Sequence, residues 1–207
     1  MASSDAHVYR PAHGTGLPHD PLNAIVGPRP IGWISTVDTV GRRNLAPYSF
    51  FNAFNYHPPI IGFSSVGWKD TVSNVSATGE FVWNLATMDL AARMNETSAT
   101  LPPDHDEFDL GGLTPVDSLD VSAARVLESP VNFECRLSQL IRLEGADGSP
   151  VDAWLVLGEV VVVHIDRMAL VDGVYDTAGV RPILRAGGPA DYVEIDPAAV
   201  FRMKRPQ

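Results

Sequence analysis

The chain has 207 residues, of which 45% are hydrophobic and 19% are charged, and its formal net charge is −10. This composition is typical of a folded protein and excludes a disordered one, and the length fits one domain of ordinary size. The negative charge argues against nucleic acid as the main partner. Any anionic ligand must therefore be held by local groups against the overall field.

Cysteine usage and hydropathy predict the compartment. The single cysteine, Cys135, allows no intrachain disulfide, so nothing indicates an oxidising compartment. It alternates in phase with apolar residues over 131–137, which predicts a buried strand thiol rather than a nucleophile. The first residues show no basic region followed by an apolar one, as a signal peptide would. The longest apolar stretch, 154–163, is too short to span a bilayer. We therefore expect a cytoplasmic protein that binds no membrane.

The chain divides into an arm, a domain and a tail. Residues 1–27 are rich in Pro, Gly and His and lack periodicity, so they predict an extended N-terminal arm. Residues 28–195 form the predicted domain, because no linker divides them and no internal repeat is present. Residues 196–207 are the predicted C-terminal tail.

The first half of the domain predicts short strands and two helices. Runs of β-branched and aromatic residues predict strands at 31–38, 44–47, 60–65 and 81–86. Segment 48–59 combines aromatic residues with Asn and a Pro pair, which is typical of a loop that covers something. Residues 69–79 predict a short helix with Asp70 as its N-cap. Residues 89–97 predict a second helix.

The second half of the domain predicts two long strands after an insert. Residues 101–120 are acidic and contain Pro and Gly pairs, which predicts an exposed insert. Clear alternation over 130–144 and strong β-branching over 153–165 predict a strand pair, with its turn at 148–150. Many closely spaced strands with two small helices favour a mainly β fold, a barrel with helical decoration.

Common catalytic and metal-binding motifs do not occur in the sequence. It contains no Gly-x-Ser-x-Gly, Cys-x-x-Cys, His-Glu-x-x-His, G-x-G-x-x-G or Walker pattern. The acidic run 104–107 with Asp109 could chelate a cation, but a solvated acidic loop is the simpler interpretation. We therefore predict no metal site.

Hydroxyl and basic side chains gather at predicted strand ends and at the first predicted helix. They are Ser35, Thr36, Ser49, Ser64, Ser65, Lys69, Asp70 and Thr71. Hydroxyls, a lysine and free N–H groups at a helix N-terminus are what a phosphate needs. The alternative is that the hydroxyls cap turns and that Lys69 is a solvated surface charge. The residues alone leave both interpretations open.

Aromatic residues are concentrated in the same part of the chain. Between residues 33 and 68 the sequence carries Trp33, Tyr48, Phe50, Phe51, Phe54, Tyr56, Phe63 and Trp68. A flat tricyclic ring needs an apolar slot with a few polar groups at its edge. The alternative is that most of these side chains fill the core of a barrel.

Several sequence blocks resemble the flavin reductase-like, FMN-binding split-barrel family. The first three are PRPIGWIST at 28–36, NLAPYSFFN at 44–52, and a block that runs from KDT at 69 to FVWN at 84. Further blocks are GEV at 158–160 and RAGG at 185–188 with Tyr192. The match runs from about residue 20 to 192. Ala186 departs from the family, where leucine is more usual at this packing position.

The resemblance implies an FMN-binding split β-barrel with six strands, a Greek-key-like order and a few short helices. It also implies a homodimer with FMN near the subunit interface. The first block then lies near the flavin, the second along the ring and its polar edge, and the third at the phosphate. The implied cofactor-binding residues are Ser35, Thr36, Ser49, Phe50, Asn52, Ser64, Lys69 and Thr71. Arg29, Arg185 and Tyr192 are left out, since their blocks suit folding or dimer contacts equally well.

The activity that the resemblance implies is an NAD(P)H:FMN oxidoreductase. Hydride would pass from nicotinamide C4 to flavin N5, and no protein acid or base is obligatory for that step. NADH or NADPH would be the co-substrate, and reduced flavin could supply a partner monooxygenase. One alternative is an electron carrier that holds FMN without nicotinamide turnover. Another is a flavin-free dimeric binding module.

Overall fold

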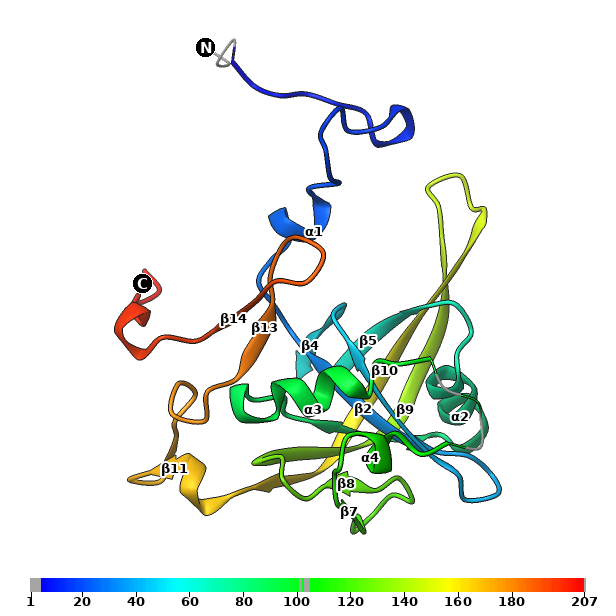
Figure 1. The fold of residues 1–207 in the computed structure, drawn as a ribbon, viewed down its shortest axis with the longest axis vertical. Coiled ribbons are helices and arrows are strands. Elements are labelled where there is room, and N and C mark those ends of the chain that lie inside the picture. Colours follow the sequence, from blue (N-terminus) through cyan, green and yellow to red (C-terminus); the bar gives the residue numbers. More distant parts are fainter. Residues whose placement is uncertain (1–4, 101, 103–104, 207) are drawn as a thin grey trace.

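The computed structural model describes residues 5–100, 102 and 105–206. Its centre is an antiparallel sheet of seven strands in the order β3-β2-β6-β9-β10-β5-β4 (Figure 1). The strands are β2 (Gly32–Val37), β3 (Arg43–Tyr48), β4 (Phe51–Tyr56), β5 (Pro59–Val66), β6 (Glu80–Asn84), β9 (Val131–Glu144) and β10 (Pro150–Ile165).

The two edge strands of this sheet are consecutive in the sequence. β3 ends at Tyr48 and β4 begins at Phe51, so only Ser49 and Phe50 connect opposite edges. Since so short a connection spans at most about 11 Å, the sheet must curl until its edges nearly meet. The Ser64 N–H donates to the Phe50 carbonyl (2.8 Å), which ties the connection to β5. The result is the split β-barrel that the sequence predicted, with a sheet of seven strands where six were expected.

Short helices and small sheets surround the barrel. The helices are α1 (Leu22–Ile25), α2 (Asp70–Thr78), α3 (Ala91–Glu96) and α4 (Glu107–Leu110), with 3₁₀ turns at Pro11–His13, Met88–Leu90, Arg167–Ala169 and Pro197–Ala199. The small sheets pair β1 (Arg29–Pro30), β13 (Ile183–Arg185) and β14 (Tyr192–Glu194); β7 (Pro115–Val116) and β8 (Arg125–Val126); and β11 (Leu170–Val171) and β12 (Val174–Tyr175). Helix α2 packs on β2 and α4 packs on β3. Among the described residues, every helix falls short of what crossing a membrane requires in length and apolar character.

The barrel interior is filled by aromatic and β-branched side chains, including Phe63 and Phe81, whose rings meet edge to face. Gly158 on β10 faces the Phe81 ring, and a Cβ at this position would lie 2.3 Å from it. Close packing therefore requires glycine there. Cys135 is fully buried on β9, as predicted, and burial raises the pKa of its thiol.

The prediction of an exposed insert at 101–120 was wrong for residues 105–120, part of which packs into the core. Residues 101, 103 and 104 lie outside the described part. Phe108 on α4 and Leu113 are buried with Trp33 and Leu45 in a second apolar cluster. The acidic residues that flank Phe108 make the segment look fully exposed in the sequence, although Phe108 itself is buried. The insert is therefore part of the wall on the β3 side of the barrel.

Two local predictions were also wrong. The predicted loop 48–59 contains β4, which pairs with β5 along an exposed sheet edge where Asn side chains face solvent at little cost. The N-cap of α2 is Lys69, whose backbone is extended (φ −99°, ψ 172°), and Asp70 is the first helical residue. A carboxylate in the first turn remains favourable there because it faces the positive end of the helix dipole.

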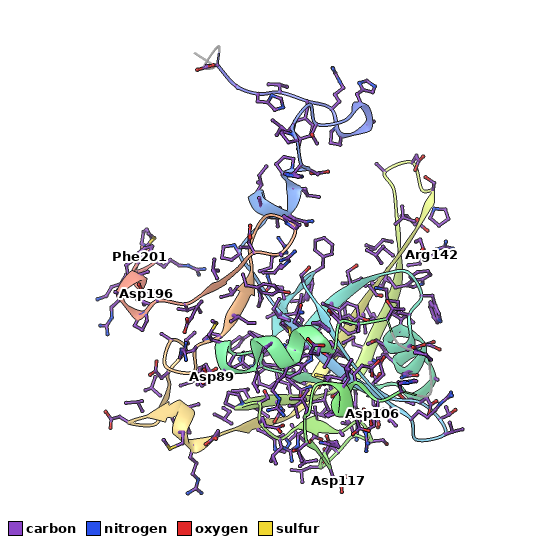
Figure 2. The ribbon with its side chains drawn as sticks, in the orientation of Figure 1. Asp89, Asp106, Asp117, Arg142, Asp196 and Phe201 are labelled. Atoms are coloured by element: carbon purple, nitrogen blue, oxygen red, sulfur yellow. The ribbon has the colours of Figure 1, made fainter. Side chains whose placement is uncertain are left out.

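The chain ends extend away from the barrel. Figure 1 shows the N-terminal arm rising from α1, and Figure 2 shows Asp196 and Phe201 in a tail on the other side of β13 and β14. Ala24 of α1 lies so close to Gly187 that a Cβ on the glycine would be 2.5 Å from the Ala24 Cβ. The boundaries 1–27, 28–195 and 196–207 stay a prediction.

Candidate functional site

A cleft of about 450 Å³ opens beside the β3–β4 connection. Its walls come from the end of β3, the end of β5, the start of α2, and the segment that follows α3. The lining residues are Asn44, Ala46, Pro47, Tyr48, Ser49, Phe50, Ser64, Val66, Lys69, Asp70, Thr71, Thr97, Ser98, Ala99, Thr100 and Glu107. The volume lies in the usual range for small-molecule sites, and the walls combine apolar and polar groups as such sites do.

Five of the eight residues predicted to bind a cofactor line this cleft. They are Ser49, Phe50, Ser64, Lys69 and Thr71. They come from three separate elements, because the curled sheet brings the β3–β4 connection next to the end of β5 and the start of α2. The second and third sequence blocks therefore meet at one place.

The other three predicted residues lie outside the lining. Ser35 is fully buried, and its hydroxyl donates to the Ala124 carbonyl (2.5 Å). Asn52 lines a separate apolar cavity, and its side-chain oxygen accepts from the Ala53 N–H (2.8 Å). Thr36 is buried one layer behind the cleft wall.

A network of amides connects Thr36 to the cleft. Thr36 Oγ1 accepts from Asn44 Nδ2 (3.3 Å) and from Asn74 Nδ2 (3.1 Å). The same Asn44 amide donates to Thr71 Oγ1 (2.9 Å). Because Thr71 receives a hydrogen bond from behind, its hydroxyl is held in place at the start of α2. Thr36 therefore supports the cleft wall from behind and does not line the cleft.

Lys69 supplies positive charge at the mouth of the cleft. Within the part of the chain that the structure describes, its ammonium makes no ion pair, and no side chain caps the N-terminus of α2. The first-turn N–H groups of α2 are therefore available beside a free cation. This end of the cleft suits an anion.

Two carboxylates moderate that positive end. Asp70 and Glu107 also line the cleft, and Glu107 Oε2 accepts from the Leu45 N–H (3.1 Å). Burial raises the pKa of Glu107 above its ordinary value. The same shift favours the neutral form of Glu107, and a neutral carboxyl does not repel a bound anion.

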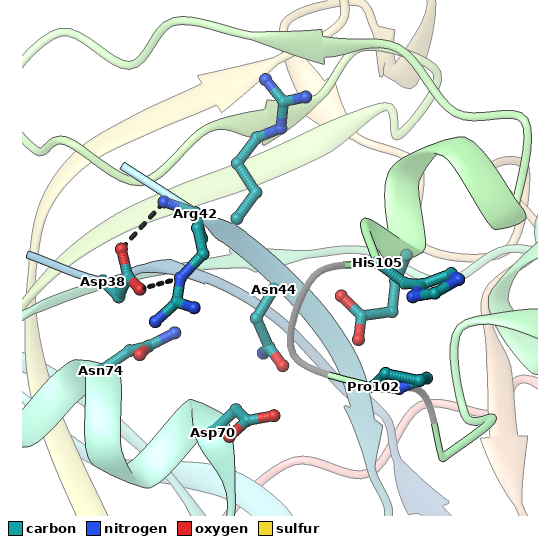
Figure 3. Close-up of a pocket in the computed structure, with 9 residues that line it drawn as sticks. Asp38, Arg42, Asn44, Asp70, Asn74, Pro102 and His105 are labelled. Atoms are coloured by element: carbon teal, nitrogen blue, oxygen red, sulfur yellow. Dashed lines mark hydrogen bonds and ion pairs between the residues drawn. The ribbon is translucent and has the colours of Figure 1, made fainter. Parts of the chain in front are cut away.

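A small polar pocket adjoins the cleft behind Asn44, Asp70 and Glu107. Figure 3 shows Asp38 joined to Arg42 on one side and His105 facing them from the other. Both arginines of this pocket form ion pairs: Arg42 with Asp38, and Arg43 with Asp106. The two guanidinium groups of this pocket are therefore already neutralised by carboxylates.

The acidic run considered for a cation has structural roles in its described part. Asp106 caps α4 by accepting from the Phe108 N–H (2.9 Å) and pairs with Arg43 at 2.6 Å. Asp104 lies outside the described residues. In the described ranges, no group of three or more His, Cys, Asp or Glu side chains is arranged to hold a metal ion.

Arg29 organises the β3–β4 connection from behind. Its guanidinium donates to the carbonyls of Ser49 (2.9 Å), Asn23 (2.6 Å) and Val26, and lies 5.5 Å from the centre of the Phe50 ring. These contacts fix the connection and join α1 to it. Arg29 therefore holds the cleft wall, and its donors face carbonyls rather than a ligand.

Arg185 has a comparable role in the β13–β14 turn. It donates to the carbonyls of Asp191 (3.1 Å), Gly188 (3.3 Å) and Pro189 (2.6 Å), and stacks 4.9 Å from the Tyr192 ring centre. The paired glycines of this block thus belong to a turn that the arginine closes.

Sequence reasoning missed several lining residues. Tyr48 is buried, and its hydroxyl is the one buried side-chain polar atom in the described chain that lacks a hydrogen-bond partner. Asn44 and Tyr48 lie inside the second block, so their polarity was visible there. Segment 97–100 and Glu107 reach the cleft only through tertiary packing, which no local pattern signals.

Comparisons with known proteins agree with this architecture. The family model described as "Flavin reductase like domain" matches residues 27–183. An uncharacterized protein of Aquifex aeolicus is 37% identical over 171 residues, which cover 79% of this chain and 83% of that protein.

Solved structures give the same result. Nitrilotriacetate monooxygenase component B from Bacillus cereus is 34% identical with a TM-score of 0.80, and the match covers 88% of this chain and 90% of that one. A protein with a split-barrel domain from Shewanella frigidimarina, assigned as a flavin reductase, is 27% identical with a TM-score of 0.77, over 88% and 89% of the two chains. The chain therefore belongs to the flavin reductase-like family of split-barrel proteins.

Proposed function

We propose that this chain is a flavin reductase that binds FMN in the cleft beside the β3–β4 connection and uses NADH or NADPH as co-substrate. The observation that carries the proposal is the convergence of unpaired donors at one end of a partly apolar cleft. These donors are the Lys69 ammonium and the first-turn N–H groups of α2, with the Thr71 hydroxyl beside them.

The residues at this end fit a phosphate. Lys69 would offset part of its charge, which the acidic protein otherwise repels. Thr71 is held by Asn44, and Ser64 contributes a further hydroxyl from β5. In the proposed site, Lys69, Thr71 and Ser64 therefore contact the phosphate, and Thr36 supports Thr71 from behind.

The other end of the cleft fits a flat ring. Phe50 is 43% exposed and lies next to Pro47 and Val66 in the lining, so an apolar ring can cover these groups. In the described part of the chain, the N–H groups of Ser49 and Phe50 donate to no backbone acceptor. Arg29 fixes the Ser49 carbonyl, so these N–H groups are held in a constant position and can bind the polar edge of the ring.

Bound FMN would supply the hydride-accepting chemistry, and the protein would supply position and electrostatics. The nicotinamide would have to stack on the exposed ring face with reacting atoms about 3–3.5 Å apart. No side chain of the cleft is required as acid or base for this step. We infer that reduced flavin can serve a partner oxygenase, since the similar Bacillus cereus protein is named as a monooxygenase component.

A cofactor-retention experiment tests the binding part of the proposal. Protein loaded with FMN and desalted is expected to keep flavin absorbance, whereas riboflavin should bind far more weakly because it lacks the phosphate. Equal affinities for FMN and riboflavin would contradict the phosphate site.

Steady-state oxidation of NADH and NADPH, with and without free FMN, tests the reaction. Retained FMN without turnover would favour the electron-carrier alternative, and failure to bind any flavin would favour the binding module.

We also propose that the protein is a homodimer with two-fold symmetry. The exposed edge strand β4 carries Phe54 (54% exposed) and Tyr56 (82% exposed) beside Phe50. Exposed aromatic clusters of this kind are typical of interfaces. Light scattering is expected to give a mass near twice the chain mass of 22.3 kDa. A monomer at micromolar concentration with FMN fully bound would contradict this assembly.

A further inference from the structure

The apolar cavity that Asn52 lines lies between the barrel and the chain segment 175–184. Its volume is about 330 Å³, and its walls come from β4, β5, β6 and β9 on the barrel side and from this segment on the other side. The Ile183 N–H donates to the Ala86 carbonyl (3.1 Å), and both residues belong to the lining. The two sides of the cavity are therefore joined by the backbone.

Aromatic rings form the barrel side of the cavity. The rings of Phe51 and Trp83 are nearly parallel (10°) with their centres 5.5 Å apart, and the Phe133 ring centre lies 4.7 Å from that of Trp83. Trp83 Nε1 donates to the Ile31 carbonyl (2.8 Å), which fixes the ring. A Cβ at Gly32 would lie 2.9 Å from the Phe51 ring, so this ring is packed directly on β2. The rings therefore form a preformed apolar surface on which a flat molecule can stack.

The lining of this cavity is uncharged. Among the described residues that line it, none is an acid, a lysine, an arginine or a histidine, and the polar ones are Asn52, Tyr175 and Thr177. A charged molecule would lose its hydration here without gaining a counter-charge, which is costly. Water is also held poorly in a mainly apolar cavity, because a buried water needs about two to four polar partners. The lining therefore favours an uncharged, apolar occupant.

The size and the place of the cavity restrict the occupant further. An apolar cavity of about 150 Å³ is large enough for benzene, so a cavity of about 330 Å³ has room for a molecule with two fused rings. The cavity and the flavin cleft share no lining residue, although Phe50 lines the cleft and Phe51 lines the cavity. Both can therefore be occupied at the same time.

We propose that the apolar cavity is a second small-molecule site, which binds an uncharged molecule with a flat two-ring system while the flavin cleft is occupied. This inference goes beyond the proposed function and does not depend on it. The probe 2-naphthol has two fused rings and is uncharged at neutral pH. Naphthalene-2-sulfonate has the same rings and a permanent negative charge. The two probes together therefore test the shape and the charge of the occupant.

Two substitutions fill the cavity from different walls. Ala53 on β4 pairs with Ile61 on β5, and paired residues share a face of the sheet. Since both line the cavity, Ala53→Trp places the new ring inside it. Thr177→Trp fills the cavity from segment 175–184. Tyr56→Trp is the matched control, because Tyr56 is exposed on the same strand as Ala53 and lies outside the lining.

Equilibrium dialysis with and without excess FMN measures the binding of each probe. The parent protein is expected to bind one 2-naphthol per chain, equally well with and without FMN. It should bind naphthalene-2-sulfonate about ten-fold or more weakly, since the cavity supplies no cation. Each filling variant should bind 2-naphthol about ten-fold or more weakly than the parent, because the new ring takes the space of the probe. Tyr56→Trp should match the parent, and a thermal melt shows which variants are folded.

Four results would overturn the inference. They are no binding of 2-naphthol to the parent, equal affinities for the two probes, displacement of 2-naphthol by FMN, and unchanged 2-naphthol affinity in a folded filling variant. The two filling variants alter different segments, so one that folds is enough for the comparison. Equal affinities of the parent for FMN and riboflavin would instead contradict the proposed flavin site and leave the binding of 2-naphthol as expected. The two failures are therefore distinguishable.

Discussion

Lys69→Ala is expected to weaken FMN binding by about ten- to a hundred-fold. A charge-assisted hydrogen bond to phosphate contributes roughly 1.5–3 kcal/mol, whereas a solvated surface charge contributes less than about 1 kcal/mol. Lys69 has no ion pair within the described ranges that its loss would break. The apo-protein's Tm and its riboflavin affinity should therefore stay nearly unchanged. Fluorescence titration with both flavins and a thermal melt measure all three quantities.

The chain offers a matched control in Lys204, its second lysine, which lies exposed in the C-terminal tail. Lys204→Ala should leave FMN binding at the parent value. Thr71→Ala should act in the same direction as Lys69→Ala but less, because a neutral hydroxyl donates a weaker bond. If Lys69→Ala bound FMN as tightly as the parent does, the phosphate would have to lie elsewhere. Arg29 and Arg185 are poor replacements, since their guanidinium groups already bond several carbonyls each.

Glu134→Ala is expected to lower the free energy of unfolding by roughly 3 kcal/mol. Glu134 is fully buried on β9 and accepts from the N–H groups of Leu119 (2.8 Å) and Asp120 (2.7 Å) and from His164 Nε2 (2.6 Å). Alanine would leave these donors without an acceptor and would release the segment around them from the barrel. Urea unfolding measures the loss, and the Tm should fall by about 6–12 °C.

Glu159→Ala is the control for this change, because Glu159 lies exposed on the neighbouring strand β10. It should alter the unfolding free energy by less than about 0.5 kcal/mol. Flavin binding in both variants should stay close to that of the parent at temperatures where they are folded. A Glu134→Ala protein as stable as the control would show that the three hydrogen bonds contribute nothing net.

The same carboxylate gives a pH dependence with a defined sign. Burial opposes its charge, but the two N–H donors and His164 together lower the pKa of Glu134 below the ordinary 4.5. A lowered pKa contributes stability that is complete above the ordinary value and is lost as the pH falls through the folded-state value. The unfolding free energy of the parent should therefore decline in that acid range more steeply than that of Glu134→Gln. If the unfolding free energies of the parent and of Glu134→Gln fell in parallel with pH, the lowered pKa of Glu134 would be contradicted.

The parts of the site that were predictable are those in which neighbouring residues act together. Lys69 and Thr71 flank the start of a helix, and Ser49 and Phe50 form one short connection, so their proximity follows from local structure. The barrel itself followed from the ordered sequence blocks. Edge strand β4 was missed because its Asn and aromatic residues lack the alternation of a half-buried strand.

The structure leaves the remaining predicted residues out of the cleft lining for geometric reasons. Ser35 and Thr36 are adjacent on β2, and successive strand side chains point to opposite faces, so both cannot face one ligand. Thr36 points towards α2 and Ser35 towards Ala124. Segment 97–100 and Glu107 reach the cleft through contacts between distant segments, which a single sequence does not encode in any local pattern.

The connection between opposite edges of the sheet also determines at which stage of folding the cleft forms. Residues 49 and 50 lie between two strands that are neighbours along the chain but stand at the two ends of the strand order. All five strands between them must be assembled before this connection has walls on both sides. A chain in which the two edge strands have not yet met therefore has no cleft for a flavin, even when most of its strand pairs are formed. The absorbance of bound flavin in a desalted preparation would therefore measure the fraction of molecules in which the barrel has closed.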